Sequence, residues 1–141
     1  MEVDVNYLAV LLAGVSSMAV GAVWYARSVF GETWMKLAKV KMNGNMSAME
    51  NVRLFGLTFL ASLVMAYVLA HVTFLSNDFF GGSFFASALT MAFWLWLGFT
   101  AVRFLTHDLF EGRPMKLTLL TAGNELVTVM VMALVIGLMG V

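Results

Sequence analysis

The Lys and Arg residues of this chain gather around two of its five polar segments. Those around the first internal gap in the hydrophobic sequence are Arg27, Lys36, Lys39, Lys41 and Arg53, and those around the third gap are Arg103, Arg113 and Lys116. The two ends and the middle gap have only the acidic residues Glu2, Asp4 and Asp78. This distribution is typical of a membrane protein with a definite orientation, because short cytoplasmic loops are rich in Lys and Arg.

The composition supports the same class of protein. Hydrophobic residues make up 62% of the chain and charged residues 11%, whereas soluble domains have about 45–50% and about 25%. So few polar residues cannot cover a soluble globule of 141 residues, and we expect lipid to cover the outer surface. Because the chain has no cysteine, it can form neither a disulfide nor a thiolate metal site.

Four apolar stretches are long enough to cross the hydrocarbon core, which takes about 20 helical residues. They run over residues 7–24, 54–74, 84–104 and 117–141. Helices are the expected form, since backbone groups cannot stay unpaired in lipid. The sequence therefore predicts an all-α membrane protein, with four transmembrane helices in an up-down bundle and a single domain over residues 1–141.

The charge distribution also predicts an orientation in the cell membrane. Both basic gaps belong in the cytoplasm, so both termini are expected outside. The lipid bilayer is then the first partner of the chain.

The first gap contains a segment with the pattern of an interfacial amphipathic helix. Residues 31–42 place Trp34 and Leu37 on one side and lysines elsewhere, as suits a helix at headgroup level. Trp24, Tyr25 and Trp34 are candidate interface anchors. The segment is either an anchor at the cytoplasmic face or a helix that docks a partner.

Local signals mark the other boundaries. Residues 43–45, Asn-Gly-Asn, predict a turn, and Ser47 with Glu50 has the capping-box spacing that predicts a helix start near Ala48. Residues 76–83 are expected to form a tight external turn. Within the short gap 107–114, Gly112 suits a helix end and Pro114 suits the first turn of the last helix.

Several motifs resemble one family of bacterial membrane proteins. These are residues 21–25 (Gly-Ala-Val-Trp-Tyr) with Phe30-Gly31 and Trp34, residues 96–99 (Trp-Leu-Gly-Phe), residues 109–114 (Leu-Phe-Glu-Gly-Arg-Pro) with Lys116-Leu117, and Asn124. Together they resemble the family called domain of unknown function 1761. The resemblance implies a four-helix integral membrane protein and brings no activity, cofactor or catalytic residue. Glu125 stands where that family has a small residue, so the resemblance implies no role for it.

Glu125 is the acidic residue that membrane insertion disfavours most in this chain. It lies eight residues beyond Leu117, about 12 Å into the membrane, where an acid costs about 2.5–3.5 kcal/mol and usually faces a bundle interior or wet cavity. Counting residues from the boundaries puts a polar group of every helix near this depth. The expected intramembrane polar layer consists of Ser17, Ser62, Trp96, Thr100, Asn124 and Glu125.

Three interpretations of this layer stay open. In the first, its members form hydrogen bonds with one another and hold the helices together. In the second, they line a polar cavity for a proton or small solute. In the third, the Glu125 face contacts a partner helix.

The second group of candidate residues is a charged loop at the cytoplasmic face. Its members are Arg103, His107, Asp108, Glu111, Arg113 and Lys116. We expect Asp108 and Glu111 to pair with nearby basic residues, and Arg103 to be an anchor that snorkels or else a partner for Glu125. His107 and Glu111 are one helical turn apart, but two or three ligands in one loop are a weak metal signal. His71 is expected near the outer membrane interface.

No catalytic, metal, cofactor or nucleic-acid site is expected. The chain has no phosphate-binding loop or Gly-x-Gly-x-x-Gly pattern and no nucleophile–base arrangement. Ala13, Ser17 and Gly21 on the first helix, and Ala133 and Gly137 on the last, have small-xxx-small spacing that either closes the bundle or makes an oligomer.

The sequence favours a non-enzymatic structural or accessory subunit that self-associates, as a homodimer or higher homo-oligomer. The alternative is a minimal proton-linked transporter or channel for a small solute that uses Glu125.

Overall fold

The computed structural model describes residues 3–40 and 46–141, and all the elements within them are helices. In chain order these are α1 (Tyr7–Trp24), η1 (Arg27–Gly31), α2 (Glu32–Ala38), α3 (Ala48–Phe80), α4 (Phe84–Leu95), η2 (Trp96–Ala101), α5 (Val102–Phe110) and α6 (Met115–Met139). The segments labelled η are π-helical turns. Four helices are long and apolar enough to cross a membrane: α1, α3, the continuous α4–η2–α5 helix and α6.

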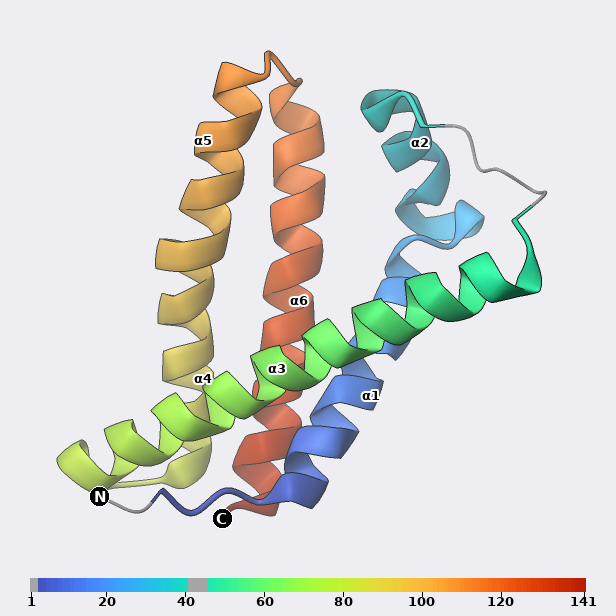
Figure 1. The fold of residues 1–141 in the computed structure, drawn as a ribbon. Coiled ribbons are helices and arrows are strands. Elements are labelled where there is room, and N and C mark those ends of the chain that lie inside the picture. The colour runs from blue at the N-terminus through green and yellow to red at the C-terminus, as the bar shows by residue number, and fades with distance from the viewer. Residues whose placement is uncertain (1–2, 41–45) are drawn as a thin grey trace.

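Helix α6 is the centre of the packing. It contacts α1, α4 and α5, and to a smaller extent α2 and α3. Figure 1 shows the two termini near each other at one end of the molecule, with α2 and the α5–α6 turn at the opposite end. The two basic segments of the sequence therefore lie at the same end.

Small residues allow α4 and α6 to approach closely. Ala88 and Ala92 of α4 and Ala133 of α6 are all fully buried. A Cβ atom added at Gly137 would lie only 3.0 Å from the Cα of Phe85. The small-residue pair of the last helix, Ala133 and Gly137, thus closes the bundle within one chain.

The small residues of α1 divide between packed and open positions. Ala13 and Ser17 are buried, whereas a Cβ atom added at Gly21 would meet nothing within 4 Å. Asn6 caps the start of α1, its side chain accepting a hydrogen bond from the Ala9 amide at 3.0 Å. The chain itself therefore uses only part of this small-xxx-small face.

Helix α3 begins as the sequence predicts and is packed along only part of its length. The Ser47 hydroxyl accepts from the Glu50 amide, and the Glu50 carboxylate accepts from the Ser47 amide at 2.7 Å, which completes the capping box. Its 33 residues correspond to about 50 Å. Figure 1 shows α3 crossing the other helices obliquely. None of residues 48–61 is buried, and the buried side begins at Ser62.

The predicted external turn over residues 76–83 is wrong for most of its length. Helix α3 continues to Phe80, and only Gly81, Gly82 and the N-cap Ser83 separate it from α4. Gly81 and Gly82 have φ of 72° and 89°, which glycine adopts without strain. The Asn77 side chain donates to the Gly82 carbonyl at 3.2 Å, so the polar residues stay helical and stabilise the turn from inside α3.

The third predicted helix is too short by six residues. It continues beyond residue 104 to Phe110, so His107 and Asp108 are helical and the connection to α6 is only residues 111–114. Gly112 has φ of 65° and ends the helix as expected. Pro114 is the N-cap of α6, one position before the predicted first turn. The π-helical segment η2 was not predicted.

The predicted amphipathic helix over residues 31–42 is shorter in the structure. The π-turn η1 occupies Arg27–Gly31, α2 covers Glu32–Ala38, and Lys39 ends α2 with φ of 55°. Gly31 is required, because a Cβ there would collide with the carbonyl oxygen of Tyr25. Met42 and the Asn-Gly-Asn turn at 43–45 lie outside the described residues.

The close approach at Gly137 predicts a large effect of one substitution. Gly137→Val should lower the free energy of unfolding by about 1–3 kcal/mol, since its methyl groups would meet backbone and Cβ atoms of α4. Gly21→Ala is the matched control and should be neutral or stabilising by up to about 1 kcal/mol. Unfolding of the purified protein in detergent measures both. Equal stability of Gly137→Val and the unmodified protein would contradict this packing.

Candidate functional site

A pocket of about 450 Å³ lies between α3, the α4–η2 segment and α6. Its lining is almost entirely apolar, with Glu125 the one ionisable residue. The lining residues are Val64, Met65, Val68, Leu69, Leu95, Trp96, Phe99, Thr100, Glu125 and Val129. Ligand sites in proteins commonly have volumes of about 300–1,000 Å³ and few polar groups.

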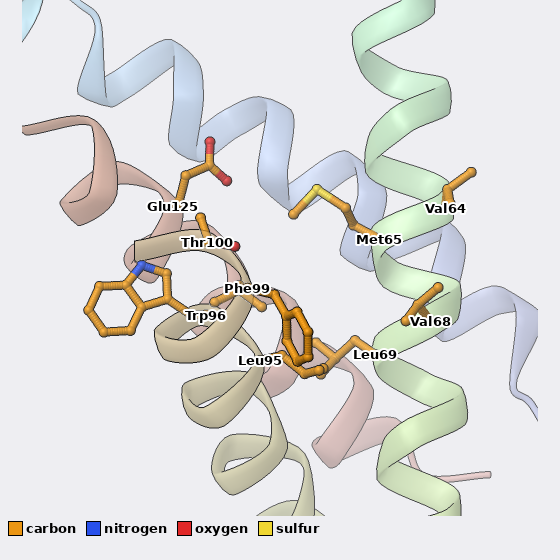
Figure 2. A pocket seen from close by; sticks show the side chains of 10 residues that line it. Val64, Met65, Val68, Leu69, Leu95, Trp96, Phe99, Thr100 and Glu125 are labelled. Atoms are coloured by element: carbon orange, nitrogen blue, oxygen red, sulfur yellow. The ribbon is translucent and has the colours of Figure 1, made fainter. Parts of the chain in front are cut away.

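The pocket has a polar side and an apolar side. Figure 2 shows Glu125 and Thr100 on one side, facing Met65 and Val64 across the pocket. Phe99 is 76% exposed and Val64 63% exposed, so the pocket is reached from the surface between α3 and η2.

The π-turn η2 provides three of the lining residues: Trp96, Phe99 and Thr100. A π-turn widens the backbone spiral by bonding each N–H five residues back. Such turns are rare, and they occur frequently at functional sites. This irregular backbone and Glu125 therefore line the same pocket.

The Glu125 carboxylate has no partner of opposite charge in the part of the chain that the structure describes. No hydrogen bond or ion pair reaches it within residues 3–40 and 46–141. Arg103, which the sequence offered as a partner, contacts Nε2 of His107 through Nη2 at 3.2 Å instead. Tyr25 lies close enough for burial and, second, the Glu125 charge to raise the pKa of its phenol.

Trp96 ties η2 to α6 by a direct hydrogen bond. Its indole Nε1 donates to the carbonyl oxygen of Ala122 at 2.9 Å. This bond lies one helical turn from Glu125 and holds the two walls of the pocket together.

The structure brings together only part of the predicted polar layer. Trp96, Thr100 and Glu125 line the pocket, whereas Ser17, Ser62 and Asn124 do not. The Ser17 hydroxyl donates to the Gly14 carbonyl at 3.0 Å and the Ser62 hydroxyl to the Thr58 carbonyl at 3.0 Å. Mutual bonding between the helices was therefore the wrong expectation for the two serines, because each hydroxyl reaches the backbone of its own helix.

Asn124 lies on a different side of α6 from Glu125. It is 5% exposed, and its Nδ2 has no hydrogen-bond partner among the described residues. Adjacent residues of a helix point about 100° apart, so Asn124 faces the bundle while Glu125 lines the pocket.

The predicted charged loop is organised by Asp108. This residue is 8% exposed, and its Oδ2 accepts a hydrogen bond from the Thr118 hydroxyl at 2.6 Å across the hairpin. Nε of Arg113 lies 2.6 Å from Glu111 and 3.9 Å from Asp108, which confirms the expected pairing. Lys116 is exposed.

The described residues contain no group of three metal-ligand side chains. The Asp108 carboxylate is directed to Thr118 and the Glu111 carboxylate to Arg113.

The three candidate interface anchors make contacts inside the protein. The Trp24 ring packs 4.6 Å from that of Phe30 and covers Gly123 of α6. The rings of Tyr25 and Trp34 meet edge to face at 5.3 Å. These contacts hold η1 and α2 against the end of α1.

His71 lies within α3, with its ring 5.1 Å from that of Tyr67. Its Nδ1 is buried and has no hydrogen-bond partner in the described residues.

Several residues of these sites were not found from the sequence. Met65 and Phe99 resemble any other lipid-facing side chain until the helices are packed. Thr118 needs the hairpin geometry before its bond to Asp108 is visible. Tyr25 was predicted as an interface anchor just after the first span, but its proximity to Glu125 did not follow from that.

Comparison with known proteins gives one match. A family model described as "Protein of unknown function (DUF1761)" matches residues 8–137. The chain belongs to the DUF1761 family. The match covers nearly the whole chain and confirms the resemblance found in its motifs. No curated protein and no solved structure matches the chain.

DUF1761 is a family of unknown function, so membership in it assigns no activity to this chain. The pocket beside Glu125 and the unburied first part of α3 are the two features that the packing of a plain helical bundle does not require.

Proposed function

We propose that this DUF1761 protein is a non-enzymatic integral membrane protein that self-associates and acts as a structural or accessory subunit. One observation carries the proposal: residues 48–61 of α3 have no buried member, although they belong to a single 33-residue helix. Within this part, Asn51 and Phe59 are half-buried and the other residues are exposed, so most of its surface is free for a partner.

A second copy of the chain is the occupant that suits the free part of α3. Gly56 has nothing within 4 Å of an added Cβ, so another helix can approach its backbone closely. Around a two-fold axis the same face of each copy covers the other, so one surface suffices for both partners. The functional form is accordingly a homodimer whose four-span bundles meet through α3.

Cross-linking tests this arrangement directly, because the natural chain has no cysteine. Leu57→Cys, on the free part of α3, should form a disulfide-linked dimer when the protein is oxidised in lipid vesicles. Val15→Cys is a comparably exposed control on α1 and should stay largely monomeric. Dimer yields are read on a non-reducing gel at several lipid-to-protein ratios. Equal yields for the two variants, or yields that vanish on dilution in lipid, would refute the α3 dimer.

We further propose that the protein lies in the cell membrane with both termini outside. The two basic segments support this orientation because they occupy the same end of the molecule, opposite the termini. The cytoplasmic side of a membrane protein is the side richer in Lys and Arg. The α5–α6 turn and α2 then face the cytoplasm.

Single cysteines also report this orientation. Asp78 and Lys116 are exposed residues that lie near opposite ends of the molecule. In intact cells, a membrane-impermeant maleimide should label Asp78→Cys and should label Lys116→Cys only after the membrane is opened. The reverse pattern would invert the topology.

The pocket favours a second candidate function, the proton-linked transport of a small solute. Glu125 is an ionisable group in an otherwise apolar pocket, and intramembrane acids commonly mark proton or solute pathways. Burial and, second, the Glu125 charge raise the pKa of the Tyr25 phenol, so Tyr25 is a titratable neighbour of Glu125. A transporter needs water or solute to reach the carboxylate, whereas a structural subunit keeps the pocket filled by lipid.

Proton movement distinguishes the two functions. Vesicles containing the purified protein and a pH-sensitive dye should dissipate an imposed pH gradient faster than empty vesicles if Glu125 carries protons. Glu125→Gln should fold normally and lose that excess rate, because the amide cannot exchange the proton. Glu32→Gln, at the exposed start of α2, is the control and should keep it. Identical rates for Glu125→Gln and the unmodified protein would end the proton-linked hypothesis.

A further inference from the structure

The pocket has one carboxyl group, that of Glu125, surrounded by hydrocarbon and aromatic groups. Glu125 has no basic partner among the described residues, and Arg103 contacts His107 instead. Apart from Glu125 and Thr100, the lining consists of aliphatic, thioether and aromatic side chains. An unpaired carboxylate is unfavourable in such surroundings, so a guest with a positive charge gains more here than in bulk lipid.

The lining also restricts the kind of cation. Metal ions such as Ca²⁺ need six to eight oxygen ligands, and this pocket supplies one carboxylate and one hydroxyl. An organic cation needs no such shell, because aromatic faces and a single carboxylate can stabilise its diffuse charge. Phe99 provides an aromatic ring at the pocket surface, and Figure 2 shows it on the η2 wall across from α3.

We propose that this pocket binds a lipophilic organic cation, a molecule with one positive charge surrounded by hydrocarbon or aromatic groups. The cation places its charge beside Glu125 and its apolar groups between Met65, Val68 and Phe99. It enters from the surface between α3 and η2, where Val64 and Phe99 are exposed. The inference deepens the transport candidate by naming its substrate class, and it rests on the same pocket.

The size of the pocket fits this class of ligand. A volume of about 450 Å³ is within the range of sites that hold drug-sized molecules, about 300–1,000 Å³. A lipid chain would also fill it, but would leave the carboxylate without a partner. The pocket should therefore distinguish the proposed ligand from ordinary lipid by its positive charge and not by its shape.

Two probes of nearly identical shape and opposite charge test that property. Tetraphenylphosphonium is the cation and tetraphenylborate the anion, each titrated by equilibrium dialysis against the purified full-length protein in uncharged detergent. The protein should bind the cation saturably and should not bind the anion above the level of empty micelles. Equal binding of the two ions would overturn the proposal, since shape and hydrophobicity alone would then explain it.

Substitutions locate the binding in the pocket. Glu125→Gln should weaken binding of the cation by about tenfold or more, because the amide has no net charge. Phe99→Leu should weaken it about two- to fivefold through the lost aromatic face. Met65→Trp, which fills the pocket from α3 without touching the charge, should also abolish binding. Glu32→Gln, at the exposed start of α2, is the control and should bind as the unmodified protein does.

The binding measurement is independent of transport. Thermal unfolding of each variant shows that it is folded, and Met65→Trp keeps the test valid if Glu125→Gln is unstable. If the protein binds the cation saturably and selectively but moves no protons in vesicles, the ligand-binding proposal stands and the transport function is refuted. Unchanged affinity in both Glu125→Gln and Met65→Trp would remove the ligand proposal, whatever the vesicles show.

Discussion

Close packing of small residues along α6 is the constraint on which the rest of this fold depends. Lipid tails are as apolar as Leu, so burial from water cannot drive helices together within a membrane. Van der Waals contact takes its place, and it requires backbones that approach closely. Gly137 meets Phe85 and Ala88 of α4, Ala133 is fully buried, and α1 also packs against α6. Helix α6 is thus in contact both with α1 and with the continuous α4–η2–α5 helix.

The same constraint explains the position of α3. Its contact with α1 is near Gly14, where an added Cβ would collide with the end of the Leu63 side chain. Its buried residues are confined to the part from Ser62 to Thr73. Residues 48–61 have no buried member, and α3 leaves the bundle obliquely (Figure 1). The divergence of α3 from η2 and α6 then leaves the pocket between them, with Glu125 on its wall.

The sequence predicted the features that depend on local rules. Continuous apolar runs gave four helices, and the Ser47–Glu50 spacing gave the start of α3. The ends of α3 and α5 were missed because Asn77 and Asp108, polar residues that usually signal loops, find hydrogen-bond partners in place. Depth counting placed Trp96 and Glu125 at one level, and both line the pocket. The same count wrongly grouped Ser17 and Ser62 with them, because the depth of a residue does not show towards which neighbouring helix its side chain points.

Two departures from regular membrane-helix structure lie at one place in this molecule. Glu125 is an acid without a basic partner in the described chain, and η2 is an irregular turn in an otherwise continuous helix. A sequence that obeys the packing rules elsewhere usually breaks them at functional or strained sites. Were both departures structural accidents, nothing would require them to line the same pocket from different helices. The Trp96 bond to Ala122 joins the two helices beside that pocket, so the interaction that holds α6 to η2 also fixes Glu125 opposite an open, apolar wall.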